Sequence, residues 1–435
     1  MRKMLRVKRV SVVLGVLILV ALAMVGVLSI TRGTPVRTVV AVGDAEGPPP
    51  VSDSLFAETM EIYTGLHLMP GNAVRQLNNG DVYAQLWRDL RSAQQTITVQ
   101  MYYSQPGAVA DTMAAILKAR ARAGVRVLFV LDAFGSQDLK KAWADSLEAA
   151  HVRLGLLRQV HWYSLHNASD RSHVRAVVVD GKVGYTGGFG LADYWLGNGK
   201  QRDQWRDSNV RFEGPAVLSL QAAFAAAWAE STGELLAGDT FFPRALLRAH
   251  PGTVQAGVFF SSPTTGSTPA ERFNALSIAS ARKSLYVTNS YFVPDDDFRN
   301  LLLQARRRGV DVRILTVSKE TDVKTTWWAG RSRYEQLLEG GIRIYEYQPA
   351  MMHSKTFVVD GVWGSIGSMN FDNRSLAFNN ESNLVLLDQG EGAKMDSVFF
   401  DDLTRSKEIT LAEFRRRPWR ERVIEWGASL LSRLL

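Results

Sequence analysis

Two segments of the chain repeat one pattern of residues, HVRAVVVD at residues 173–180 and HSKTFVVD at residues 353–360. In each segment a histidine and a cation two positions later begin a run of mostly β-branched or aromatic residues, which predicts a buried β-strand. Side chains alternate across a strand, so residues i and i+2 point to one face and residue i+7 points to the other. The histidine and the cation therefore share a face, and the closing aspartate does not.

A histidine beside a fixed cation suits attack on a phosphate ester, because negative charge grows on the phosphoryl oxygens in the transition state. One such histidine alone would more often be a structural residue, but the repeated pattern favours catalysis. We predict that His173 and His353 are catalytic and that Arg175 and Lys355 hold the phosphate oxygens. One neutral imidazole would form a phosphohistidine while the other, protonated, gives its proton to the leaving alcohol.

This chemistry needs no cofactor, and the sequence has no His, Asp and Glu cluster at metal-ligand spacing. Each motif is followed downstream by an acid, then Ser-Asn and an aliphatic residue, at Asp207 and at Glu381. An acid so placed can accept the far ring N–H of a histidine and fix its tautomer. The competing interpretation of these two acids is a salt bridge at a sheet edge.

The remaining site candidates belong to the same two motifs. Ser368 and Asn370 follow a glycine in GSMN at residues 367–370, and we predict that they bind phosphate as neutral donors. Asp180 and Asp360 point away from the site by strand parity, which predicts a buried structural role.

Composition restricts the function less than the motifs do. A chain of 435 residues is long enough for two domains or one large duplicated core. Cysteine is absent, which excludes disulfides and thiolate metal sites. The net charge of +8 is compatible with nucleic acid, with anionic lipid or with the topology of a membrane protein.

Residues 10–30 contain no charged side chain, and they are numerous enough to cross about 30 Å of hydrocarbon. Five basic residues precede this run and only Arg32 and Arg37 follow it closely. The positive-inside rule therefore predicts a transmembrane helix with a cytoplasmic N-terminus and the catalytic part outside. The alternative is a cleaved signal peptide with its small-residue site at Ala21-Leu22-Ala23.

A β-α-β succession at residues 96–103, 109–123 and 125–131 returns at 284–292, 298–308 and 310–317. Alternating strands and helices predict an α/β fold with a parallel or mixed sheet flanked by helices. We interpret the repetition as a duplication whose halves are related by a pseudo-twofold axis, with the site at their interface. The predicted parts are an anchor at 1–31, a linker at 32–53, halves at 54–245 and 246–412, and a C-terminal amphipathic helix at 413–435.

The C-terminal helix is predicted to begin after Pro418, because apolar residues then recur at spacings of three and four. These apolar residues are Trp419, Val423, Trp426, Leu430 and Leu434. Two alternatives remain open for this helix, docking on the domain or lying in a membrane interface.

The chain resembles the phospholipase D superfamily, whose motif is H-x-K-x4-D with a following G-[GS]-x-N, and within it is most similar to bacterial cardiolipin synthases. The supporting stretches are GS at 135–136, DGK at 180–182, TGG at 186–188, WRD at 205–207, SYFVPD at 290–295, RIYEY at 343–347, HSK at 353–355, GSMNFDNRS at 367–375 and NNE at 379–381. The resemblance covers about residues 60–412. It implies duplicated phospholipase D-like halves and the joining of two phosphatidylglycerols into cardiolipin, with release of glycerol, at a bacterial inner membrane.

Two departures fall in the first motif, where Arg175 replaces the family's lysine and Gly190 its asparagine. They leave open a catalytically impaired, lipid-binding protein beside the transferase. A further alternative is hydrolysis by a phospholipase D or, less favoured, by a phosphodiesterase of nucleic acid. The predicted anchor and the tryptophan-bearing tail favour phospholipid and membrane as partners, with no nucleic acid expected. The sequence does not predict the oligomeric state.

Overall fold

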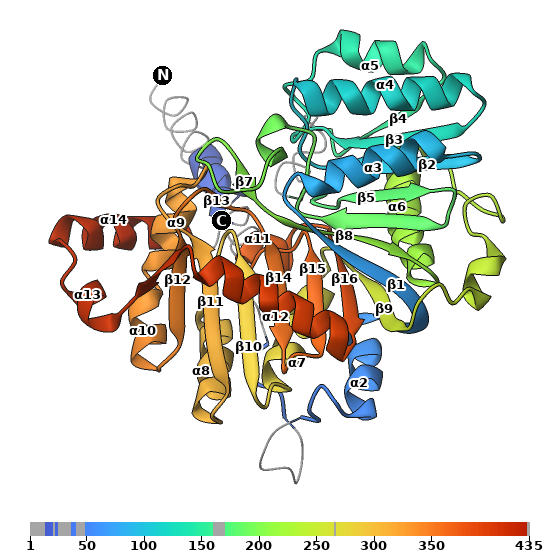
Figure 1. The fold of residues 1–435 in the computed structure, drawn as a ribbon. Coiled ribbons are helices and arrows are strands. Elements are labelled where there is room, and N and C mark those ends of the chain that lie inside the picture. Colours follow the sequence, from blue (N-terminus) through green and yellow to red (C-terminus); the bar gives the residue numbers. More distant parts are fainter. Residues whose placement is uncertain are drawn as a thin grey trace, which may run out of the picture.

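The computed structural model describes residues 14–20, 22–24, 36–40, 48–159, 170–264 and 267–432. Most of the strands in these ranges join one 15-stranded sheet, which runs through the molecule (Figure 1). Strands of the first part of the chain follow one another as β4 (Arg153–Leu157), β3 (Arg126–Asp132), β2 (Thr96–Met101), β5 (Ala176–Val179), β6 (Val183–Gly187), β8 (Ser208–Glu213) and β1 (Met69–Asn78).

The strands of the second part of the chain repeat that order. They follow one another as β12 (Arg343–Tyr347), β11 (Asp311–Val317), β10 (Ser284–Asn289), β14 (Lys355–Val359), β15 (Trp363–Gly367), β16 (Glu381–Leu387) and β9 (Val254–Ser261), with β17 (Ser406–Ile409) added beside β12. The two series meet where β1 and β9 pair antiparallel. In each series three strands are parallel and the others antiparallel, which confirms the predicted mixed sheet.

Helices cover both faces of the sheet. Those of the first part are α3 (Asp81–Ser92), α4 (Ala108–Arg122), α5 (Lys141–Glu148) and α6 (Ala216–Thr232). Those of the second part are α7 (Pro269–Ala279), α8 (Asp296–Arg307), α9 (Lys324–Arg331), α10 (Tyr334–Glu339), α11 (Asn373–Ala377) and α12 (Gln389–Leu403). Neighbouring residues of one strand enter different cores, since Val385 packs with α7 and α8 while Leu384 packs with α12. This alternation is the period of two expected of a sheet buried on both sides.

The predicted β-α-β units agree with the structure to within about two residues at most of their boundaries. Helix α2 (Ser54–Thr64) begins the continuous part of the fold, at the residue where the globular part was expected to start. Two further helices, α13 (Leu411–Arg415) and α14 (Trp419–Ser429), end it. The C-terminal helix thus begins after Pro418 as predicted.

The predicted membrane span lies mostly outside the described residues. Of residues 10–30, the structure describes 14–20 and 22–24, which are helical. Within the described ranges, no helix combines the length and the apolar character needed to cross a bilayer.

Candidate active site

His353 is positioned by a short sheet that joins the two parts of the chain. Strand β13 (Met351–Met352) pairs in parallel with β7 (Trp205–Arg206), and the His353 N–H then donates to the carbonyl oxygen of Arg206 at 2.7 Å. This register sets Asp207 beside the imidazole, with 2.8 Å between His353 Nδ1 and Asp207 Oδ2. The first motif's downstream acid therefore serves the second motif's histidine.

His173 is placed by the matching contact on the other side. Ser172 and Asn380 form an isolated parallel β-bridge, and the His173 N–H donates to the carbonyl oxygen of Asn380 at 2.9 Å. His173 Nδ1 then lies 3.0 and 3.1 Å from the two carboxyl oxygens of Glu381. Both acids contact histidines as expected, but each histidine takes its acid from the other part of the chain.

The two cations lie buried beside the histidines. Lys355 Nζ donates to Ser290 Oγ at 2.8 Å and to the carbonyl oxygen of His353 at 2.5 Å. Arg175 Nη1 donates to the carbonyl oxygen of His173 at 2.7 Å, and its guanidinium lies 5.6 Å from the ring centre of Tyr102. Each cation lowers the pKa of both histidines, so all four side chains belong to one site.

Burial makes both imidazoles neutral. It lowers the pKa of His353 to about 3, with Lys355 adding to the effect and Asp207 opposing it. Burial, with the charges of Arg175 and Lys355, also lowers the pKa of His173 well below its usual value. A neutral imidazole keeps the free lone pair that a nucleophile needs.

The two acids differ in the direction of their pKa shifts. Burial raises the pKa of Glu381 to about 8, although Ser368 and Arg175 oppose it. Burial acts on Asp207 in the same sense, but His353 and Lys355 hold its pKa below the usual value. Asp207 is therefore a carboxylate at neutral pH, whereas Glu381 retains a proton.

Ser368 and Asn370 do not lie in equivalent surroundings. Ser368 Oγ donates to Glu381 Oε2 at 2.5 Å, which places it behind His173 as a support for the acid. Asn370 is buried, and its Oδ1 has no hydrogen-bond partner among the described residues. Because an amide oxygen only accepts, any contact of Asn370 with a phosphate oxygen would have to come from its Nδ2, which can donate.

Asp180 and Asp360 lie at hairpin turns and away from the histidines, as strand parity indicates. The Asp180 carboxylate accepts the backbone N–H groups of Gln94, Gln95 and Thr96 at 2.7–3.1 Å. The Asp360 carboxylate accepts the N–H groups of Arg282, Lys283 and Ser284 at 2.7–3.2 Å. Both side chains are half-buried rather than fully buried, because the chain segments they hold run at the surface.

Trp195 fills the place that the departure at Gly190 leaves open. A Cβ atom on Gly190 would lie 2.9 Å from the Trp195 ring and 2.8 Å from the carbonyl oxygen of Tyr103. Trp195 Nε1 donates to Asp207 Oδ2 at 2.7 Å. A Cβ on Gly188, the counterpart of Ser368, would lie 2.3 Å from Asp207 Oδ1. The indole thus gives Asp207 the hydrogen bond that Ser368 gives Glu381.

Sequence reasoning missed Trp195, Tyr102 and Trp205 as members of the site. The Tyr102 ring lies edge-on to His173 at 4.9 Å, and the Trp205 ring lies 4.8 Å from that of His353. Trp205 stands two residues before Asp207, which was a usable signal, whereas Trp195 lies in a 3-10 turn without any pattern.

Within the part of the chain that the structure describes, no group of three or more His, Asp or Glu could hold a metal ion.

Comparison with known proteins gives consistent results. The family model "Cardiolipin synthase, PLD-like domain" matches residues 86–228 and 276–403. A cardiolipin synthase of Geobacillus kaustophilus is 35% identical over 362 residues, which cover 82% of this chain and 72% of that protein. Cardiolipin synthase 2 of Bacillus anthracis is 36% identical over 364 residues, covering 83% and 70%.

Among solved structures, phosphatidylserine synthase of Haemophilus influenzae superposes with a TM-score of 0.67. The match covers 87% of this chain and 100% of that chain at 12% identity. This likeness shows a shared fold.

Proposed function

Because the chain belongs to the family of cardiolipin synthases with a phospholipase D-like domain, we propose that it is a phosphatidyltransferase. It joins two phosphatidylglycerol molecules into cardiolipin and releases glycerol. The observation that carries the proposal is the pair of buried neutral histidines, each bound through Nδ1 to an acid from the other part of the chain.

In the first step, His353 attacks the phosphorus of the donor lipid. Its Nδ1–H donates to the Asp207 carboxylate, which leaves the Nε2 lone pair free. A P–N bond forms as the P–O bond to glycerol breaks. The glycerol oxygen takes the proton that His173 shares with Glu381, a pair in which the pKa of Glu381 of about 8 keeps a proton available at neutral pH.

In the second step, the hydroxyl of another phosphatidylglycerol attacks the phosphohistidine. His173, now without the transferred proton, accepts the proton of that hydroxyl as the new P–O bond forms and the P–N bond breaks. The guanidinium of Arg175, the ammonium of Lys355 and the amide of Asn370 stabilise the charge on the non-bridging oxygens. Ser368 positions Glu381, and Asp180 and Asp360 hold the hairpin turns.

The chain is a duplication of one phospholipase D-like half, at residues 54–245 and 246–412, around a pseudo-twofold axis. The identical strand order of the two series supports this proposal. The cross-paired acids support an interfacial site, since neither half holds a complete histidine–acid pair by itself.

A transmembrane anchor at residues 1–31 and a linker at 32–53 hold the catalytic part on the outer side of a bacterial inner membrane. The uncharged residues 10–30 and the basic residues before them support this topology. Protease protection of the C-terminal part in right-side-out vesicles would argue against it.

The test is a lipid assay with the full-length protein in phosphatidylglycerol vesicles. We expect free glycerol and a lipid with four acyl chains by mass spectrometry, and loss of both in His173→Ala and His353→Ala. His67→Ala, which changes an exposed histidine, is the matched control and should leave the rate unchanged. Phosphatidic acid in place of the four-chain lipid would indicate hydrolysis, and no product from the intact chain would indicate an impaired enzyme.

A further inference from the structure

Helix α14 is turned with its charged side inward and its apolar side outward. Its buried residues are Glu425 and Ala428, and Glu425 is 2% exposed. Trp419 and Trp426 are 70% and 65% exposed. The other apolar residues exposed on and just after the helix are Val423, Ile424, Leu430 and Leu431. This is the reverse of the usual surface helix, whose apolar stripe faces the core.

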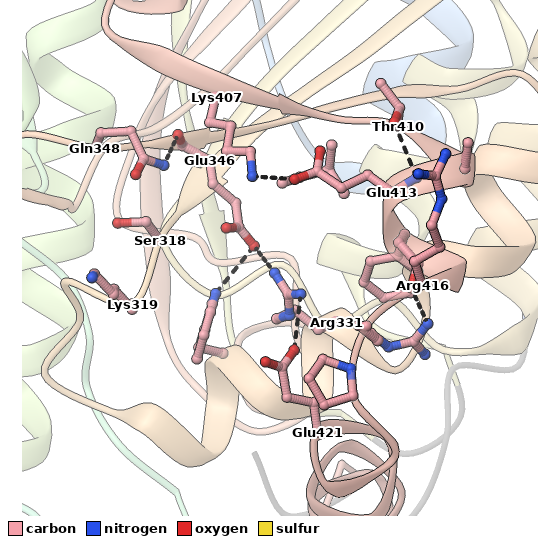
Figure 2. Close-up of a pocket in the computed structure, with 16 residues that line it drawn as sticks. Ser318, Lys319, Arg331, Glu346, Gln348, Lys407, Thr410, Glu413, Arg416 and Glu421 are labelled. Atoms are coloured by element: carbon pink, nitrogen blue, oxygen red, sulfur yellow. Dashed lines mark hydrogen bonds and ion pairs between the residues drawn. The ribbon is translucent and has the colours of Figure 1, made fainter.

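Ion pairs fix this orientation. Glu425 bonds Arg417 at 2.9 Å and lies 3.4 Å from Arg331. Arg331 also pairs with Glu346 at 2.8 Å and lies 3.8 Å from Glu421, and Figure 2 shows these two acids pointing toward its guanidinium. Rotating the helix to bury its tryptophans would leave these charges unpaired, at a large cost in free energy.

Unpaired cations lie on α14 and just before it. Arg416, Arg420 and Arg422 are exposed, and within the described residues none of them forms an ion pair with an acid. Arg420 lies over the Trp419 ring at 5.8 Å. Both acids of the helix, Glu421 and Glu425, are directed to Arg331. Among the described residues, the surface of α14 therefore combines exposed apolar side chains with positive charge that no acid pairs with.

We propose that this outer surface of α14 docks into the interface of a bilayer that contains anionic phospholipid. Tryptophan rings take up the headgroup level, aliphatic side chains enter the acyl boundary, and the arginines meet lipid phosphates. A second copy of the chain is a poorer occupant, since symmetric pairing would bring the arginines of both copies together. The proposal goes beyond the proposed reaction, because it rests on exposure and charge alone.

A cysteine-free chain allows a direct test on the full-length protein. Val423→Cys, at a side chain that is 54% exposed, carries one environment-sensitive fluorophore. Leu235→Cys, at a side chain that is 88% exposed and outside α14, carries the same fluorophore as the matched control. Both labelled proteins are reconstituted into vesicles whose lipids bear a nitroxide quencher on the acyl chain. We expect strong quenching and a blue shift at position 423 with phosphatidylglycerol, and little change at position 235.

The lipid charge is tested in the same assay. Quenching at position 423 should fall in phosphatidylcholine vesicles and in a variant that also carries Arg420→Glu and Arg422→Glu. Equal quenching at 423 and 235 would overturn the docking, and equal quenching with both lipids would overturn the role of anionic lipid. A blue shift without quenching would mean that protein covers the helix, which also overturns the proposal.

Discussion

The two histidine motifs share a backbone plan and differ in how their side chains are supported. Lys355 donates to the hydroxyl of Ser290, the residue after β10. The corresponding residue after β2 is Tyr102, whose ring lies beneath the guanidinium of Arg175. Arginine is thus matched to an aromatic face and lysine to a hydroxyl. The departure at Arg175 is a supported variant of the site, which argues against simple decay.

The acids behind the histidines differ in the same way. Glu381 accepts from Ser368 and has its pKa raised to about 8, whereas Asp207 accepts from Trp195 and stays ionised. One pair is therefore suited to hold a proton and the other to activate a nucleophile. Under the proposed mechanism, the two motifs would therefore carry opposite halves of one reaction.

The largest expected effect is on covalent labelling. With lipid labelled at phosphorus, His353→Ala should abolish the phosphohistidine, because the attacking nitrogen is gone. His173→Ala should still form it, although slowly, since only the proton donor is lost. The label is measured on full-length protein after a denaturant quench, on gels kept at alkaline pH because the P–N bond hydrolyses in acid, with His67→Ala as control. Label retained in His353→Ala and lost in His173→Ala would reverse the assigned roles.

The next effect separates the two acids. Asp207→Asn should lower kcat about 10²- to 10⁴-fold, because an amide can no longer stabilise the Nδ1–H tautomer of His353. Glu381→Gln should lower it less, about 10- to 100-fold, because the amide keeps this position uncharged but cannot return a proton to His173. Steady-state cardiolipin formation gives both values. Equal losses would contradict the difference drawn from their pKa shifts.

The dependence of rate on pH should reflect the second motif's lysine. Burial lowers the pKa of Lys355 to about 7, so its charge is lost as pH rises through that value. Arg175 remains a cation throughout, despite burial that lowers its pKa. We expect kcat to decline above about pH 7, in proportion to the protonated fraction of Lys355.

Lys355→Arg provides the control for this profile. In this variant kcat should decline at a higher pH than in the wild type, near the pKa of Glu381 at about 8. This shift is expected whatever the absolute rate of the variant. The wild-type and variant profiles of kcat between pH 5 and 10 are compared in vesicles of one composition. A limb that does not move would show that Lys355 is not the titrating group.

Much of the fold and half of the site followed from local patterns in the sequence. The strands and the histidines that begin them were predictable, because a buried strand shows its apolar and alternating residues within a short stretch of sequence. The cross-pairing of acids was not, because His353 and Asp207 are 146 residues apart and the short β7–β13 sheet that joins them has no periodic signal. The spacing predicted α14 as a helix, but its orientation depends on where the distant Arg331 lies.

A smaller effect is expected where Arg175 meets Tyr102. Arg175→Lys should lower kcat/KM about tenfold, because the ammonium loses the stacking contact and has no hydroxyl like that of Ser290 to bond. Adding Tyr102→Ser should restore part of the loss by supplying that hydroxyl. The double-mutant cycle measures the coupling, and strictly additive losses would argue against matched supports.

The smallest effect concerns the indole that replaces a hydroxyl. Trp195→Phe keeps the ring beside His353 but removes the 2.7 Å hydrogen bond to Asp207 Oδ2. A single neutral donor to a buried carboxylate contributes about 1.5–3 kcal/mol. The separate bond from Ser208 N–H to the other oxygen, Oδ1, at 2.8 Å remains and keeps the carboxylate in place. We expect kcat to fall only several-fold, and the pKa of Asp207 to rise because the charged form has lost a donor. The acidic limb of the rate profile should then move to higher pH, whereas Trp87→Phe on α3, at a partly buried tryptophan of the same core, should leave it in place. An unchanged acidic limb in Trp195→Phe would mean that the indole only fills space, and the two copies would then differ in packing rather than in how their acids are held.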